Sequence, residues 1–133
     1  MSRSAMYTAN TGAQVVGVGG TIAPGGIIRR FGCGVDLNGT AINVTEAGYY
    51  SVSASITAEP TAAGTVTATL FNNGVEVPGA TASATAAAAG DPVNMAIEAV
   101  VRIPCGGNAG SLSFVLEDAA ATITNIAVVV EKL

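Results

Sequence analysis

Residues 123–133, Ile-Thr-Asn-Ile-Ala-Val-Val-Val-Glu-Lys-Leu, predict a β-strand that is apolar on both of its faces. β-Branched residues dominate this stretch, and no helical repeat of apolar side chains runs through it. Successive side chains of a strand point to opposite faces. One face therefore carries Ile126, Val128 and Val130, and the other carries Ala127 and Val129. An antiparallel sheet usually keeps one face polar, so we expect one face to pack on the protein's own core and the other on a second subunit.

The rest of the chain consists of short alternating segments separated by turns. The longest predicted strand runs from Tyr49 to Glu59, and Asn38-Gly39 is a strong hairpin signal. Further strands are expected at residues 14–18, 27–31, 35–37, 41–44, 65–71, 75–77, 93–103 and 112–116. This pattern predicts an all-β, single-domain antiparallel sandwich of nine or ten strands over residues 13–133. Residues 1–12 are polar, and we expect them to form a separate N-terminal segment and a candidate anchor.

The composition favours a rigid structural protein over a cytoplasmic enzyme. Half of the 133 residues are hydrophobic, yet aromatic residues make up only 5% and charged residues 11%. Ordinary globular proteins carry about 25% charged residues. The net charge is −4 and the largest basic cluster is Arg29-Arg30, so no nucleic-acid partner is expected. No signal-peptide pattern and no run of roughly 18 apolar residues is visible, so no membrane partner is expected either.

No pattern in the sequence indicates catalysis or metal binding. The chain contains no histidine, which removes histidine-based triads and histidine–metal sites. The adjacent acidic side chains of Glu117 and Asp118 would diverge on a strand. Cys33 and Cys105 are too few for a zinc site, and the sequence leaves open whether they form a disulfide or stay free thiols. We therefore predict no catalytic residue, no metal and no cofactor, and we expect that the protein is not an enzyme.

Two segments in the middle of the chain have a distinctive sequence. Residues 48–56 read Gly-Tyr-Tyr-Ser-Val-Ser-Ala-Ser-Ile, and residues 65–74 read Thr-Val-Thr-Ala-Thr-Leu-Phe-Asn-Asn-Gly. With these segments the chain resembles the jelly-roll superfamily of tumour necrosis factor and the complement component 1q globular head. A valine-rich last strand follows in both the chain and the superfamily. The resemblance covers nearly the whole chain, and it implies a jelly-roll fold.

Four short phrases narrow the resemblance: Gly-Gly-Thr-Ile at 19–22, Ile-Ile-Arg-Arg-Phe-Gly at 27–32, Pro-Thr-Ala-Ala-Gly at 60–64 and Val-Val-Glu-Lys-Leu at 129–133. With these phrases the chain resembles most, within this superfamily, the C-terminal domains of collagen-like glycoproteins of the bacillus exosporium and small clostridial prophage proteins. The collagen-like Gly-x-y repeat of the exosporium proteins is absent from this sequence. We therefore do not expect a filament that carries this domain as its head.

The resemblance also implies a homotrimer, in which the sheet with the first, last and Gly-Tyr strands surrounds a threefold axis. The strand pattern agrees, since a ring of three heterologous contacts closes on itself. The expected interface residues are Tyr49, Ser51, Ser53, Ser55, Phe71, Ala127 and Val129. With Ala127 and Val129 near the axis, Val129→Asp is expected to dissociate the trimer, and Thr8→Asp is expected to be a neutral control.

These features favour a non-enzymatic trimeric structural protein displayed on a particle, most of all a phage capsid decoration or fibre protein. Its expected partners are further copies of itself and a capsid, fibre or spore-surface protein, and its expected location is a virion surface or a spore or cell surface. The alternative is a receptor- or glycan-binding module of a spore coat, cell surface or phage tail tip. Its candidate glycan contacts are Asn72 and Asn73, which follow the aromatic Phe71 in a predicted turn.

Overall fold

The computed structural model describes residues 4–32, 34–103 and 110–133, and the regular elements in these ranges are all β-strands. The strands are β1 (Ala5–Asn10), β2 (Gln14–Val16), β3 (Thr21–Ile22), β4 (Gly26–Phe31), β5 (Val35–Asn38), β6 (Ala41–Val44), β7 (Gly48–Pro60), β8 (Gly64–Asn72), β9 (Val75–Ala86), β10 (Val93–Ile103), β11 (Gly110–Glu117) and β12 (Ala121–Lys132). Their lengths follow the alternating segments of the sequence, with turns at glycine and asparagine.

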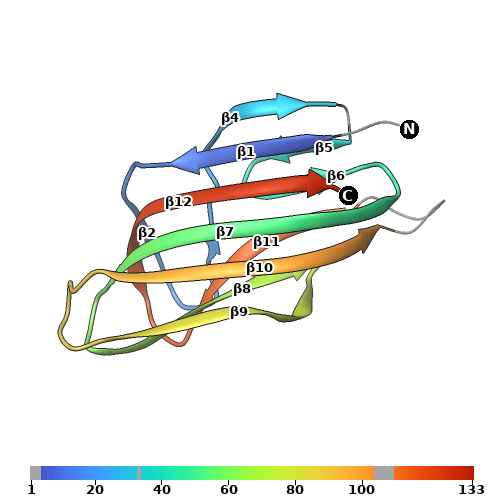
Figure 1. Ribbon diagram of the computed structural model, residues 1–133. Coiled ribbons are helices and arrows are strands. Elements are labelled where there is room, and N and C mark those ends of the chain that lie inside the picture. Colours follow the sequence, from blue (N-terminus) through green and yellow to red (C-terminus); the bar gives the residue numbers. More distant parts are fainter. Residues whose placement is uncertain (1–3, 33, 104–109) are drawn as a thin grey trace.

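The strands form two antiparallel sheets that pack face to face (Figure 1). Sheet A has the order β10-β7-β12-β1-β4, with β2 paired to β12, and sheet B has the order β5-β6-β11-β8-β9, with β3 paired to β11. Strand β1 lies against β12, so the two ends of the described chain are neighbours in sheet A. The predicted all-β antiparallel jelly roll is confirmed, with twelve strands in the described residues instead of nine or ten.

The core lies between the two sheets and follows the period of two expected for strands. On β12, the predicted inward residues Ile126, Val128 and Val130 are all fully buried. Their main counterparts on β7 and on sheet B are Tyr50, Val52, Ile56, Val66, Leu70, Leu112, Phe114 and Leu116, which are also buried. Burial of each large side chain is worth about 1.5–3 kcal/mol, so this double layer holds the sandwich together.

Two parts of the sandwich differ from the expectation. Residues Ala5–Asn10 form β1 between β12 and β4, so the sandwich includes half of the separate N-terminal segment expected over residues 1–12. The inward side chains of β1 are Met6 and Thr8, and a polar residue at one of two inward positions hides the alternation. Strand β9 continues to Ala86, beyond the predicted range 75–77. Its inward residues there are small alanines, which give only a weak alternation in the sequence. Cys33 and Cys105 lie outside the described residues, so their state stays open.

Candidate subunit interface

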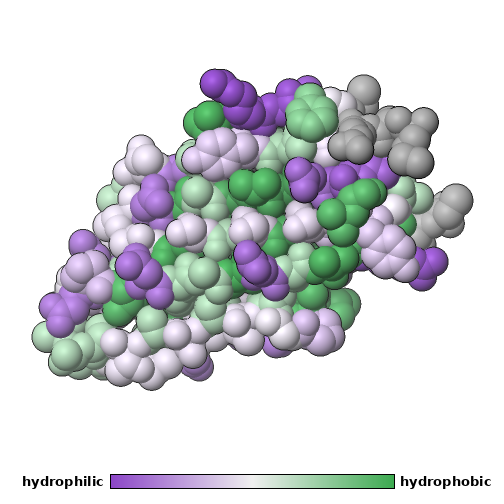
Figure 2. Space-filling model, in the orientation of Figure 1, coloured by the Kyte–Doolittle hydropathy of each residue, from purple (hydrophilic) through white to green (hydrophobic). Residues whose placement is uncertain are grey.

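The outer face of sheet A, called here the A face, carries large apolar side chains that no other part of the described chain covers. They come from five strands of the sheet and expose 38–59% of their surface: Tyr7, Phe31, Tyr49, Val100 and Val129. Figure 2 shows this side of the molecule, with hydrophobic side chains spread between pale and hydrophilic ones. A row of uncovered aromatic and valine side chains across one sheet is typical of a surface that packs on a partner.

Strand register brings most of the predicted interface residues together on the A face. Val129 of β12 lies beside Ser53 of β7, and Ala127 lies beside Ser55 in the same ladder. The remaining β7 residues of the set, Ser51 and Tyr49, continue the same outward row. Side chains as small as serine and alanine allow the backbone of another subunit to approach closely. The geometry therefore groups six of the seven predicted residues in one surface.

Phe71 is the residue that the structure separates from the others. It lies on β8 in sheet B, next to Glu76 of β9 and Ser113 of β11. Its neighbour Leu70 is buried in the core, so the alternation of the strand points Phe71 to the outside of sheet B. The A face is on the opposite side of the sandwich. Sequence alternation assigns a residue to the inside or outside of a sheet, but it does not say which of two sheets.

Sequence reasoning missed two aromatic residues of the A face. Tyr7 of β1 pairs with Val129 on one side and Arg29 of β4 on the other. Together with Phe31, these side chains border a shallow hollow of about 80 Å³. Because Tyr7 lies between the inward residues Met6 and Thr8, a strand at this place points Tyr7 outward. No strand was predicted in residues 1–12, so this position was missed. These residues widen the apolar surface from β7 and β12 to the β4 edge.

The two adjacent arginines of β4 have different surroundings. Arg29 stands on the A face beside Tyr7, as the register shows. The Nη1 atom of Arg30 lies 2.7 Å from the Oδ1 atom of Asp36, which links β4 of sheet A to β5 of sheet B. Their opposite directions follow from the alternation of side chains along a strand. This ion pair is exposed and within one chain, so it contributes little to any contact between subunits.

The predicted glycan contacts lie in the hairpin between β8 and β9. Asn73 and Gly74 both have positive φ angles, 54° and 78°, as a type I′ turn requires. The backbone N–H of Ser111 donates to Oδ1 of Asn73 at 2.9 Å, and the N–H of Asn73 donates to the carbonyl of Ser111 at 2.8 Å. The Oδ1 atom of Asn72 is buried and has no hydrogen-bond partner among the described residues. The amide oxygen of Asn73 thus has a structural role in the turn.

Within residues 4–32, 34–103 and 110–133, no group of three or more carboxylate, thiol or imidazole side chains is placed to hold a metal ion. In the same ranges, no helix is long and apolar enough to cross a membrane.

Comparisons with solved structures place this fold among known jelly rolls. Murine APRIL, crystallised at pH 5.0, matches with a TM-score of 0.75 at 11% identity over 99% of this chain and 100% of that chain. The globular domain of zebrafish complement 1qA protein matches with a TM-score of 0.71 at 10% identity over 97% and 95%. The PRD1 vertex protein P5 matches with a TM-score of 0.66 at 12% identity over 98% and 96%. The chain therefore has a jelly-roll fold of the tumour necrosis factor and complement 1q type.

No protein-family model matches the sequence. No curated protein matches it either. The likeness to solved structures thus rests on the fold alone.

Proposed function

We propose that this chain is a non-enzymatic structural protein that forms a homotrimer through its A face and is displayed on the surface of a particle. A phage capsid decoration or fibre protein is the form we favour. The observation that carries the proposal is the uncovered apolar row of Tyr7, Tyr49, Val100 and Val129 across four neighbouring strands of sheet A. Covering apolar surface stabilises an assembly by about 25 cal/mol per Å² removed from water.

The arrangement of small residues supports a close contact at the centre of this face. The middle of β7 and β12 carries only small outward side chains, those of Ser51, Ser53, Ser55 and Ala127. The larger side chains of Tyr49 and Tyr7 project further at the margin of this area. A low centre with an aromatic margin fits a surface from another copy. Ala127 and Val129 are our candidates for the positions nearest the threefold axis.

Display on a particle is supported by two features of the chain. Charged residues are only 11% of the sequence, so the exterior is covered largely by small polar side chains. The fold is similar to that of a phage vertex protein as well as to that of animal proteins. The finer likeness to exosporium glycoproteins and clostridial prophage proteins rests on the sequence phrases, and it adds a spore or cell surface as the second candidate location.

Sedimentation-velocity ultracentrifugation of the whole chain at micromolar concentration tests the proposal. We expect a single species with three times the mass of one chain. A monomer that persists when the concentration is raised tenfold would contradict the proposed trimer. A trimer that does not co-sediment with particles from the producing culture would support the proposed assembly but contradict the proposed display on a particle.

Glycan binding is the second candidate function. It is supported by the position of Asn72 and Asn73 at the β8–β9 hairpin, where Asn72 lines a hollow of about 260 Å³. A glycan array with the wild-type chain and Asn72→Ala separates the two proposals. Specific binding that Asn72→Ala abolishes would favour the glycan module. Asn73→Ala is less informative because it would also remove the hydrogen bond from Ser111 that holds the turn.

A further inference from the structure

Strand β10 is the terminal strand of sheet A, and half of its backbone groups have no strand to pair with among the described residues. The hydrogen-bond pattern identifies which half. The N–H of Leu133 donates to the carbonyl of Tyr49, and the N–H of Lys132 donates to the carbonyl of Ser4. In an antiparallel ladder these directions alternate along each strand. The odd residues of β7 therefore bond to β12, and its even residues bond to β10.

The register then fixes the direction of each backbone group on β10. Val101 pairs with Tyr50 and Ala99 pairs with Val52, so both bond to β7. Val100 and Arg102 face Ser51 and Tyr49, so their N–H and carbonyl groups point away from the sheet. Strand β9 runs nearby in sheet B, but no backbone hydrogen bond joins it to β10 in the described ranges.

A hollow of about 260 Å³ lies beside this part of the edge. It is lined by Asn72, Val75, Glu76, Val77, Pro78, Val100, Val101 and Arg102. A wide bulge in β9 opens it: Phe71 pairs with Glu76 and Thr69 with Thr81, so residues 77–80 of β9 face Leu70 alone. Gly79 has a φ of 79°, which is the sharp turn that such an excursion needs.

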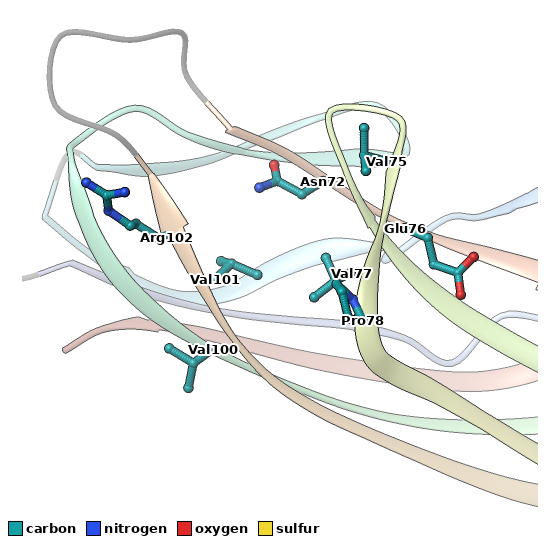
Figure 3. A pocket seen from close by; sticks show the side chains of 8 residues that line it. All are labelled: Asn72, Val75, Glu76, Val77, Pro78, Val100, Val101 and Arg102. Atoms are coloured by element: carbon teal, nitrogen blue, oxygen red, sulfur yellow. The ribbon is translucent and has the colours of Figure 1, made fainter.

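Figure 3 shows how the lining side chains divide. Val101 and Val77 point toward each other across the hollow, while the side chains of Val100, Arg102 and Glu76 point away from it. Val100 and Arg102 thus contribute their backbone to the hollow, as the register requires. The site therefore combines unpaired backbone donors and acceptors with an apolar recess made by Val77, Pro78 and Val101.

We propose that this groove binds an extended peptide segment of another protein, which adds a strand to β10. Strand addition uses main-chain hydrogen bonds for affinity and pockets for alternate side chains for specificity. The peptide residue opposite Val101 would place a medium-sized apolar side chain in the recess. The residue opposite Arg102 would lie on the A side of the sheet, where an acidic side chain would be attracted to the guanidinium. The occupant is thus a segment with adjacent apolar and acidic residues.

The length of the site favours a short segment over a second copy of this chain. Only three residues of β10 line the hollow, and the recess receives one side chain. The proposed groove uses the backbone edge of β10, whereas the proposed trimer uses the outer face of sheet A, on which the Val100 side chain lies. Failure of peptide binding would therefore leave the sedimentation result untouched, and a monomeric chain would still present the groove.

The test is an amide-resolved NMR titration of the ¹⁵N-labelled chain with capped pentapeptides. The probe is acetyl-Thr-Thr-Val-Glu-Thr-amide, and the comparison peptides replace its valine by aspartate or carry N-methyl groups on alternate amides. We expect the Val100 and Arg102 amide signals to shift with the probe and to stay in place with the comparison peptides. The lack of any shift up to millimolar concentrations of the probe would overturn the proposal.

Two proline variants provide a matched pair. Val100→Pro removes an outward N–H inside the groove, and Glu98→Pro removes an outward N–H outside it; neither breaks the ladder to β7. We expect Val100→Pro to lower the affinity for the probe peptide by about tenfold or more, and Glu98→Pro to lower it by less than about twofold. Equal loss in the two variants would contradict a groove at residues 100–102.

Amide hydrogen exchange of the unmodified chain tests the groove without any variant, so it applies even if a proline variant does not fold. We expect fast exchange at the amides of Val100 and Arg102, and protection at Ala99 and Val101. Protection at all four positions that is lost on dilution would show that a second copy occupies the edge, and it would overturn the peptide proposal.

Discussion

The two outer faces of the sandwich share the same strand geometry but differ in how their side chains are satisfied. On sheet B, hydroxyl groups bond across strands: Thr65 to Thr85 and Thr69 to Thr81, each at 3.1 Å. The carboxylates of Glu117 and Asp118 accept further bonds from Thr69 and Thr67, each at 2.6 Å. On the A face, the corresponding row holds aromatic, valine and serine side chains, and its large members remain uncovered.

This difference indicates which side of the molecule another subunit would cover. Covering the outer face of sheet B would remove water from hydroxyls and carboxylates that are already bonded to each other, and Phe71, the large apolar side chain on that face, is already partly buried. Covering the A face removes tyrosine, phenylalanine and valine side chains from water, which is the main favourable contribution to association. Substitutions that place the same chemical change on different sides of the sandwich can therefore test the comparison.

The largest effect is expected at Thr8, on the strand that also carries Tyr7. Thr8 is completely buried and its Oγ1 atom has no hydrogen-bond partner among the described residues, whereas Tyr7 points outward. Thr8→Asp is therefore not the neutral control expected from the sequence, because the new carboxylate would be an unpaired charge in the core. We expect a loss of about 3–5 kcal/mol of unfolding free energy in a urea titration. Tyr7→Asp, on the outer side of the same strand, should cost far less fold stability, and equal losses would contradict this placement of β1.

The next largest effect is expected at Val129, in the middle of the A face. Val129→Asp would place a charge in the proposed subunit contact, where an unpaired buried charge costs about 3 kcal/mol or more. Association should therefore weaken by roughly a hundredfold, which sedimentation velocity would show as dissociation at micromolar concentration.

Ser83→Asp is the matched control for Val129→Asp. Ser83 is exposed on the outer side of β9, next to Thr67 in sheet B. The same charge there should leave the mass of the assembly unchanged. If Ser83→Asp dissociated the assembly and Val129→Asp did not, the roles of the two faces would be reversed.

Most of the strands were predictable because their inward positions hold large apolar residues. The alternation of Val93, Met95, Ile97, Ala99, Val101 and Ile103 predicted both bounds of β10, and Asn72 to Gly74 predicted the hairpin between β8 and β9. Strand β1 was missed because Thr8 occupies an inward position, and the length of β9 was missed because alanine is weakly diagnostic. The alternation of apolar and polar residues does not predict a strand where the inward side chains are small or polar.

The grouping of the candidate interface residues was predictable only within one strand or one ladder. The serines of β7 follow from alternation alone, and their proximity to Ala127 and Val129 came from the resemblance to a known superfamily. Phe71 was placed with them, yet it lies on the other sheet. The groove beside Val100 and Arg102 left no signal in the sequence, because it depends on backbone direction and on a bulge in β9.

A smaller effect is expected at Tyr50, the inward neighbour of Tyr49 on β7. Its hydroxyl donates to the backbone carbonyl of Glu46 at 2.9 Å, and burial, followed by the charge of Glu46, raises the pKa of Tyr50. The unfolded chain releases this proton from about pH 10, and the folded chain only at higher pH. Between these two pH values the folded protein binds more protons, so its stability is complete below pH 10 and falls as the pH rises through the window.

Tyr50→Phe removes both the hydrogen bond and the titrating group. We expect a loss of about 1 kcal/mol at neutral pH and a flatter decline of stability above pH 10 in urea titrations. Tyr49→Phe, on the A face, should leave both quantities close to those of the wild type. An unchanged alkaline decline in Tyr50→Phe would show that another group is responsible.

The smallest effect is expected at the ion pair of Arg30 and Asp36, where an edge of sheet A meets an edge of sheet B. Both side chains are well exposed, at 42% and 62%, so the pair is screened by solvent and salt. Oδ1 of Asp36 also accepts the N–H of Leu37 at 2.9 Å, and an asparagine at this position keeps that acceptor. Asp36→Asn therefore isolates the ion pair, and we expect a loss below about 1 kcal/mol in the urea titration. The difference between variant and wild type should shrink further in 1 M salt, where the Debye length is about 3 Å. A larger loss that persists in high salt would mean that this seam, and not the core between the two faces, joins the sheets.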